Sequence, residues 1–260
     1  MSSLTPLQAF AHLPPCPQRL RLLTFNIQVG IQSQGFHHYL LRSWQHLLPS
    51  QARQASLESI AELIQSFDLV ALQEADGGSW RSGHQNQIEH LASLAEFPHW
   101  FHQVNRNLGR VAQHANGVLS RTHPFRVERH PLPGLPGRGM MVLYLGDPSD
   151  PLVIVVTHLA LNKQTQFAQI RYLVDTLADA RRVVIMGDLN QEGEWLLNQS
   201  PLKHLGLHPI ADDMPTYPSW QPRRGIDHIL ISDCIPLHRI AVIDHPLSDH
   251  LPVAAEIGLT

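Results

Sequence analysis

Six apolar segments of this chain carry polar side chains where the segment begins or ends. The segments have the continuous, β-branched character of buried strands, as in PLVIVVTHL and VVIMGDLN. A carboxylate, amide or imidazole buried there without partners is costly. One such residue is usually a turn or cap, but six such places indicate strand ends that share one polar site. The residues are Asn26, Glu74, His158, Asp188, Asn190, Asp227, Asp249 and His250.

The rest of the chain predicts many strands and few helices. Apolar spacing indicates helices over 51–66, around 88–94, and along the face that runs from Phe167 to Leu177. The segment PLPGLPGRG is predicted to be a loop because its prolines and glycines disfavour regular structure. The stretch 77–115 is otherwise polar and rich in histidine. The predicted strands lie at about 20–27, 67–76, 116–120, 125–130, 139–145, 152–158, 183–188, 226–232, 239–243 and 251–257.

Length and composition favour a single domain. The chain has 260 residues, of which 43% are hydrophobic, and shows no break in composition at which to divide it. Residues 1–18 contain four prolines and predict an irregular N-terminal arm, which leaves 19–260 as one domain. Cys16 and Cys234 form neither a disulfide framework nor a zinc module.

A hard divalent cation suits the polar residues at the strand ends. Carboxylate and amide oxygens are the ligands that Mg²⁺ prefers, with Mn²⁺ as an alternative, and the sequence offers no thiolate set for zinc. We therefore expect a Mg²⁺ site.

The same segments, read in order, resemble a known family. TFNIQ, LQEAD, NGVLSR, VVTHL, MGDLN, GIDHILIS and SDHLPV are similar to motifs of the endonuclease/exonuclease/phosphatase superfamily, which has the deoxyribonuclease I-like fold. The resemblance runs from about residue 21 to residue 257. It implies an α/β protein: a four-layered α/β sandwich with two packed, mostly antiparallel sheets and helices on the outside.

The resemblance also implies the metal site and the water-activating group. Glu74 would be the principal Mg²⁺ ligand with help from Asn26, and Asp249 would assist this site. Asp188 would activate the attacking water. Gln28 stands where some members carry an aspartate, which favours one metal ion over two.

The remaining implied roles concern the phosphate. Asn190 would hold a phosphate oxygen or the water, and His250 would stabilise charge in the transition state. Asp227 would orient His250, as carboxylates orient imidazoles in other hydrolases. His158 fills a position near the leaving group and is expected to act as a general acid.

Three further residues are expected to contact the substrate, namely Asn116, Arg121 and Asn162. Arg138, Lys163 and Arg171 stay open between a substrate contact and an ordinary surface role.

These residues predict a metal-dependent phosphoric ester hydrolase, most plainly a phosphodiesterase that uses metal-assisted attack of water. A cation and an imidazolium offset the negative charge of a phosphodiester, and a nearby carboxylate positions the water. A net charge of -3 disfavours a nucleic-acid partner, so a lipid-type or small phosphodiester is preferred to DNA or RNA. An endonuclease or exonuclease remains the alternative, and a non-catalytic binding module on the same scaffold a further one.

The sequence also bears on location. It shows no signal peptide and no apolar run near the ~20 residues that span a membrane, so we expect a cytoplasmic protein. It leaves open the oligomeric state, the natural substrate and the role of the histidines in 84–130.

Overall fold

The computed structural model describes residues 10, 16, 18–30, 51–107, 109, 112–209 and 214–259. The predicted arm over 1–18 therefore lies almost wholly outside the described residues. Phe10, one of its described members, is buried, and its ring centroid lies 5.6 Å from that of Phe67. This contact attaches at least that part of the arm to the hydrophobic core.

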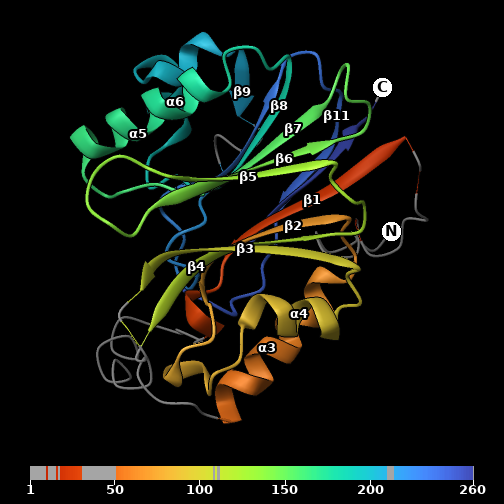
Figure 1. Ribbon diagram of the computed structural model, residues 1–260, viewed down its shortest axis with the longest axis vertical. Helices are drawn as coiled ribbons and strands as arrows, with labels where there is room; N and C mark the ends of the chain where they lie inside the picture. The colour runs from red at the N-terminus through yellow and green to blue at the C-terminus, as the bar shows by residue number, and fades with distance from the viewer. Residues whose placement is uncertain are drawn as a thin grey trace.

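The described residues form two six-stranded sheets (Figure 1). In the first sheet β1 and β2 are parallel, and the other described neighbours are antiparallel. Its strands, in spatial order, are β11 (Leu237–Val242), β12 (Val253–Gly258), β1 (Arg19–Asn26), β2 (Leu69–Asp76), β4 (Gln113–Ser120) and β3 (His99–Asn107).

The second sheet repeats this arrangement, with β7 and β8 as its parallel pair and antiparallel pairing elsewhere. Its strands, in spatial order, are β5 (Arg126–Pro131), β6 (Gly139–Leu145), β7 (Leu152–His158), β8 (Arg182–Asp188), β10 (Asp227–Ser232) and β9 (Leu207–Pro209).

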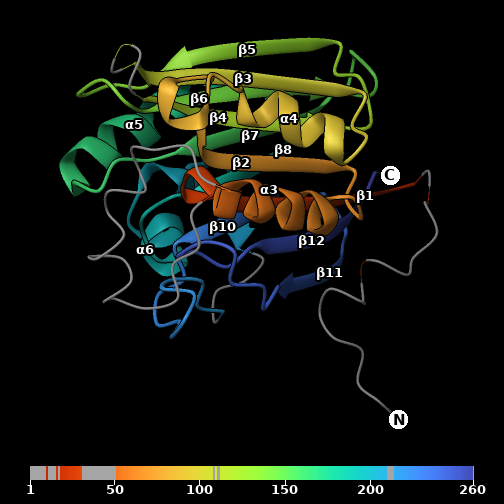
Figure 2. The ribbon, with the colours of Figure 1, turned by 90° about the horizontal axis from the view of Figure 1, so that it is seen from below.

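Helices cover the outer face of each sheet (Figures 1 and 2). On the first sheet lie α3 (Gln51–Ile64) and α4 (Gln87–Leu94), and on the second lie α5 (Lys163–Thr176) and α6 (Gly193–Asn198). The Asn86 side chain caps α4 by accepting a hydrogen bond from the Ile88 amide. Single-turn 3₁₀ helices lie at Gln28–Gly30, Trp80–Ser82 and Pro201–His204.

Three apolar layers hold the four structural layers together. Leu22, Val118 and Met186 lie among the side chains buried between the two sheets. A second cluster fills the space between the first sheet and α3 and α4, and a third lies between the second sheet and α5 and α6. Each fully buried aliphatic side chain contributes roughly 1.5–3 kcal/mol. The predicted four-layered α/β sandwich is confirmed.

Strand β3 is the main element that the sequence did not predict. It lies at the edge of the first sheet, and all of its residues are only partly buried or exposed. Edge strands need no apolar alternation, so its polar, histidine-containing sequence carries no strand signal. The short strand β9 and helix α6 were also not predicted. None of the helices in the described part of the chain has the length and apolar character required to span a membrane.

Candidate active site

The polar strand ends of the two sheets meet at one place. In the second sheet His158 and Asp188 are direct partners at the ends of the parallel strands β7 and β8. The His158 Nε2 atom lies 3.3 Å from Asp188 Oδ2. In the first sheet Asn26 ends β1, and its Nδ2 donates to the same Asp188 oxygen at 3.1 Å. Residues that are 162 positions apart in sequence thus join the two sheets through one carboxylate.

Asp188 is buried at the centre of this group. Burial raises its pKa to about 7, and the negative charges of Asp227 and Glu74 act in the same direction. The positive charge of His250 and the hydrogen bond from Asn26 lower this pKa and offset part of the effect. A carboxylate whose pKa lies near neutrality is well matched to accept a proton from water.

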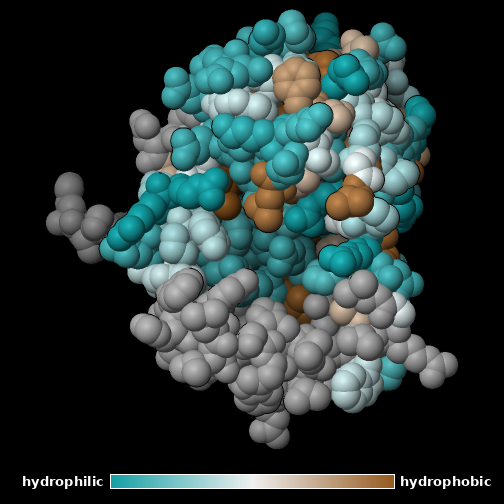
Figure 3. Space-filling view, turned by 90° about the vertical axis from the view of Figure 1, so that its left-hand side faces the viewer, coloured by the Kyte–Doolittle hydropathy of each residue, from teal (hydrophilic) through white to brown (hydrophobic). Residues whose placement is uncertain are grey.

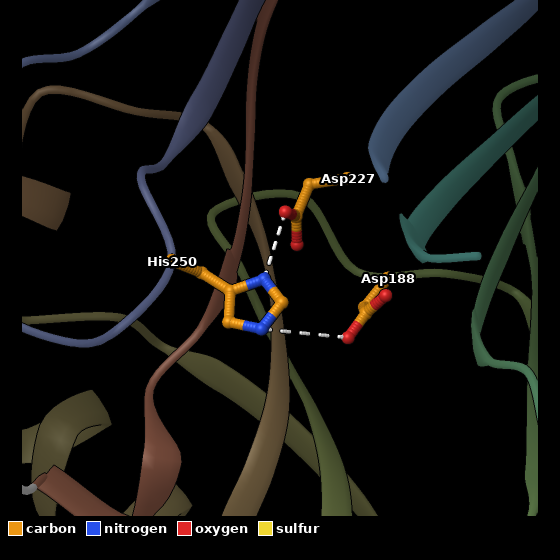
Figure 4. A group of neighbouring side chains, drawn as sticks. All are labelled: Asp188, Asp227 and His250. Carbon is orange, nitrogen blue, oxygen red and sulfur yellow. Dashed lines mark hydrogen bonds and ion pairs between the residues drawn. The ribbon is translucent and has the colours of Figure 1, made fainter. Parts of the chain in front are cut away.

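His250 lies between two aspartates (Figure 4). Its Nδ1 donates to Asp227 Oδ2 at 2.8 Å, and its Nε2 lies 3.8 Å from Asp188 Oδ2. Burial lowers the pKa of this imidazole, but the charges of the two aspartates and the hydrogen bond to Asp227 outweigh it and raise the pKa to about 10. His250 is therefore an imidazolium at neutral pH, with both ring nitrogens donating.

Thr216 also belongs to this group, although no sequence motif pointed to it. Its Oγ1 donates to Asp227 Oδ2 at 2.6 Å, which fixes the carboxylate that orients His250. Thr216 lies in an irregular segment with no strand pattern, so its position depends on tertiary contacts alone. The other Asp227 oxygen, Oδ1, is buried and has no hydrogen-bond partner among the described residues.

Glu74 reaches the site through an irregularity in β2. The β2–β4 register shifts between Leu72 and Ala75, and Glu74 within this bulge has φ +55°. Such a conformation costs a non-glycine residue roughly 1–3 kcal/mol and is typical of functional positions. Burial raises the pKa of Glu74, as does the nearby charge of Asp249, while His250, Arg138 and a hydrogen bond with Asn26 oppose the shift.

Asp249 completes an oxygen-rich group with Glu74 and Asn26. It is buried, and its Oδ1 accepts a hydrogen bond from Ser248 Oγ at 3.1 Å. Burial raises its pKa, against the opposing charge of His250. The charge of Asp249 thus disfavours ionisation of Glu74, and that of Asp227 disfavours ionisation of Asp249.

Asn190 and His158 stabilise the end of β8 in different ways. The Asn190 amide N–H donates to Asp188 Oδ1 at 3.0 Å, and its Nδ2 donates to the Leu159 carbonyl at 2.9 Å. Burial lowers the pKa of His158 well below its usual value, and the charges of Arg138 and His250 act in the same direction. A neutral His158 can share a hydrogen bond with the Asp188 carboxylate, and its expected role as general acid stays a prediction.

The three residues expected to bind substrate lie in different places. Asn162 caps α5 by accepting from the Thr165 amide and lines a cleft beside Glu74. Asn116 is buried and donates to the Gly139 carbonyl at 3.1 Å, where the two sheets approach each other.

Arg121 is not brought to the site. It follows the end of β4 that pairs with the start of β2, at the opposite end of that strand from Glu74. Its guanidinium donates to the carbonyls of Gln65, Phe67 and Glu96 and lies 4.5 Å from the centroid of the Phe97 ring. This arginine therefore stabilises the fold far from the cluster.

A cleft of about 400 Å³ opens beside Glu74. Figure 3 shows this face of the molecule, which is hollowed, hydrophilic within the hollow, and bordered by separate hydrophobic patches. Leu135 and Leu161 line the cleft with exposed fractions of 87% and 75%. The basic residues Arg106, His114 and Arg138 also line it. Arg106 was not expected from the sequence because it lies on the unpredicted strand β3, and its partner His114 on β4 was noted only as one of the histidines in 84–130.

The chain matches the sequence profile of the Endonuclease/Exonuclease/phosphatase family over residues 23–250. A search of curated proteins gave no match. Among solved structures, an endonuclease/exonuclease/phosphatase from Beutenbergia cavernae DSM 12333 superposes with a TM-score of 0.70 at 22% identity, covering 93% of this chain and 72% of that one. A mannosyl-6-phosphatase of Bacteroides thetaiotaomicron superposes with a TM-score of 0.66 at 13% identity, covering 92% and 99%. ANGEL2, a 2′,3′-cyclic phosphatase, superposes with a TM-score of 0.62 at 14% identity, covering 93% and 95%.

The profile match spans most of the chain, so the protein belongs to the Endonuclease/Exonuclease/phosphatase family. It is accordingly a phosphoester hydrolase, and the enzyme class predicted from the sequence is confirmed. Enzymes of this family generally depend on a divalent metal ion.

Proposed function

We propose that this protein is a Mg²⁺-dependent phosphodiesterase that hydrolyses a small or lipid-type phosphodiester by attack of water. The observation that carries the proposal is the chain of contacts from Asp227 through His250 to Asp188, next to the oxygen ligands Asn26 and Glu74. Together these residues provide a positively charged donor, a proton acceptor and a cation site within one polar cluster.

The oxygen-rich group fits a hard cation. Burial raises the pKa values of Glu74 and Asp249, the charge of Asp249 adds to the shift at Glu74, and a bound cation removes that penalty. We therefore assign Glu74, Asn26 and Asp249 as the residues that hold Mg²⁺, with Mn²⁺ as a substitute. When bound, the metal polarises the phosphoryl oxygen and offsets its charge.

A second group of possible ligands is better explained as an ion-paired triad. One ligand atom from each of Asp188, Asp227 and His250 lies within 4.8 Å of the others. However, both ring nitrogens of His250 already face carboxylates, Nδ1 at 2.8 Å from Asp227 Oδ2 and Nε2 at 3.8 Å from Asp188 Oδ2, so a metal ion would have to displace a proton from this imidazole. The positive charge of His250 instead attracts the negatively charged phosphate oxygens of the substrate.

Each protein group then has a defined task. Asp188 orients the attacking water and accepts its proton, a contribution typically worth ~10²–10⁴-fold in rate. His250 stabilises the negative charge that develops on the phosphate, and Asp227 keeps its ring oriented and protonated. Asn190 and neutral His158 hold Asp188 in place through hydrogen bonds or close contact.

The shape of the cleft favours a small substrate over a long nucleic acid. A volume of about 400 Å³ lies in the range of small-molecule sites. Its rim presents the exposed apolar side chains Leu135 and Leu161, and among the described residues no Phe, Tyr or Trp lines it for stacking against bases, although three basic residues do line it. An apolar rim beside a polar catalytic cluster fits the alcohol portion of a small or lipid-type diester.

The test is hydrolysis of bis-p-nitrophenyl phosphate by the purified protein with Mg²⁺ or Mn²⁺. We expect release of p-nitrophenol that EDTA stops and excess Mg²⁺ restores. Asp188→Asn should remove most of this rate while leaving the melting temperature near that of the wild type. Metal-supplemented assays that detect no cleavage of any diester would refute the proposal.

The nuclease alternative is tested in parallel. Plasmid DNA, RNA and abasic DNA should be cleaved far more slowly than a preferred small diester. If a nucleic acid proves the better substrate by kcat/KM, the alternative replaces the proposal on substrate while the catalytic assignment stands.

A further inference from the structure

Arg138 is held at the junction of the cleft and the catalytic cluster. It ends the loop between β5 and β6, where its Nε donates to the Leu159 carbonyl at 3.1 Å and its Nη1 donates to the Gly137 carbonyl at 3.3 Å. It lines both the large cleft and a small recess whose other walls include Glu74 and His158. Its Nη2 makes no hydrogen bond to a residue that the structure describes, which leaves donor capacity for a ligand.

Arg106 lies beside it from the other sheet. The β3–β4 register shifts between Val104 and Arg106, and this bulge places Arg106 opposite His114. Its aliphatic stem packs over Gly137, where a Cβ would lie 3.6 Å from both Cβ and Cδ of Arg106. Within the described part of the chain its guanidinium is exposed and has no hydrogen bond or ion pair.

The described walls of the cleft carry more basic than acidic side chains. Two arginines and His114 line it, and Glu74 is the one carboxylate on its described walls. Glu74 and Asp188 attract Arg138, whereas Arg106 repels it. Two guanidinium groups that share one cleft are mutually destabilising until an anion lies between them.

Close packing around Gly139 places Arg138 near strand β3, which carries Arg106. Gly139 leaves no room for a side chain, since a Cβ there would lie 2.2 Å from Asn105 Oδ1. Its carbonyl accepts hydrogen bonds from Asn116 and Thr157, which fixes the start of β6 against both sheets. The position of Arg138, the preceding residue, is therefore set by the same contact that brings β3 near.

We propose that Arg106 and Arg138 form a two-arginine anion subsite, and that it selects phosphodiesters whose alcohol portion carries a second negatively charged group. This rests on the proposed phosphodiesterase function. Arg138 contacts the scissile phosphate, next to Glu74 and His158. Arg106 binds the second anionic group, a carboxylate or phosphate, in the outer cleft.

The kinetic test compares two matched substrates, methyl p-nitrophenyl phosphate and carboxymethyl p-nitrophenyl phosphate, which differ by one carboxylate. The wild type should show the lower KM for the carboxymethyl ester. Arg106→Ala should raise that KM about 10- to 100-fold, the value of a charge-assisted hydrogen bond, and should raise the KM of the methyl ester much less. Arg106→Lys should recover part of the loss, and Arg138→Ala should lower kcat for both esters.

The matched control is Arg129→Ala. Arg129 is an exposed arginine of β5 outside the cleft, and its Nε donates to the His102 carbonyl. The Arg129→Ala substitution should leave the KM of both esters unchanged. Equal KM values for the two esters in the wild type, or an Arg106→Ala effect no larger than that of Arg129→Ala, would overturn the proposal while the hydrolysis itself survives. Failure to hydrolyse either ester would instead count against the proposed function.

A binding measurement tests for the anion subsite independently of catalysis. Titration of the metal-free protein with sodium sulfate, followed by calorimetry, should show binding that both Arg106→Ala and Arg138→Ala weaken and Arg129→Ala leaves unchanged. Sulfate affinity that is the same in all four proteins would contradict an anion subsite.

Discussion

Replacing Gly187 by alanine should destabilise the protein and displace its central aspartate. Gly187 precedes Asp188 on β8, has φ +147°, and pairs with Thr157 across the parallel strands. A Cβ at this position would lie 1.8 Å from the Thr157 carbonyl oxygen and 3.0 Å from its carbonyl carbon, and neither backbone atom can move without disturbing the pairing. The strained φ costs roughly 1–3 kcal/mol, and the forced backbone shift costs a further 1–3 kcal/mol or so.

These terms together predict a melting temperature lower by roughly 4–24 °C for a chain of this size. His158 and Asp188 are the next pair along the two strands, so the shift also moves the proposed water-activating carboxylate. A displacement near 1 Å can cost about 10²-fold in rate. The assays are thermal unfolding and hydrolysis below the melting transition.

Gly146→Ala is the matched control. Gly146 also has a positive φ, +81°, but a Cβ there would have no atom within 4 Å, so only a backbone cost of about 1–2 kcal/mol applies. A Gly187→Ala protein that melts at or above the temperature of Gly146→Ala, with wild-type activity, would refute the reasoning.

Three other predictions follow from the site and its surroundings. Asp227→Asn removes the charge that keeps His250 protonated but retains an oxygen acceptor, so kcat should fall by ~10²–10⁴-fold with little loss of stability, and unchanged kcat would contradict the assigned role. Arg121→Ala should lower the free energy of unfolding by about 1–3 kcal/mol through lost carbonyl hydrogen bonds and leave kcat/KM unchanged; a loss of rate without a loss of stability would return this arginine to the site. The raised pKa values of Glu74 and Asp249 mean that the folded, metal-free protein retains protons that the unfolded chain releases. Its free energy of unfolding should therefore fall as the pH rises from the ordinary carboxyl pKa of the unfolded chain to the raised pKa of the folded protein. Mg²⁺ should therefore raise the melting temperature more at about pH 8 than at about pH 5, and an equal rise at both would count against these ligands.

The sequence predicted the fold because the strands that build the core carry their own signal. The continuous apolar runs that end at His158 and Asp188 are buried on both faces and are recognisable without any neighbour. The edge strand β3 has no such signal, because solvent replaces one of its neighbours and polar residues are tolerated. The histidines that marked 84–130 as unusual are partly explained by this strand, since His99 and His102 lie on it.

The site was predictable where a polar residue directly follows or precedes an apolar strand, and not elsewhere. Asn26, Asp188 and His250 satisfy that condition, and the structure brings them together. Thr216 and Arg106 depend on a turn and on a bulge, which are fixed by contacts between distant parts of the chain. Motif similarity alone favoured Arg121 as a substrate contact, but Arg121 and its carbonyl partners lie at the end of β2 that is opposite to Glu74.

Each sheet has a single parallel strand pair among its described strands, and the two pairs contribute different halves of the proposed chemistry. The β1–β2 pair supplies oxygen donors for a cation, and the β7–β8 pair supplies the carboxylate that handles the water. Neither half is competent alone, so catalysis depends on the alignment of one sheet over the other. A sliding of one sheet over the other by less than the length of one residue would abolish activity, although every strand would keep its hydrogen bonds. Turnover would thus report the register of the sandwich more sensitively than any measure of secondary structure.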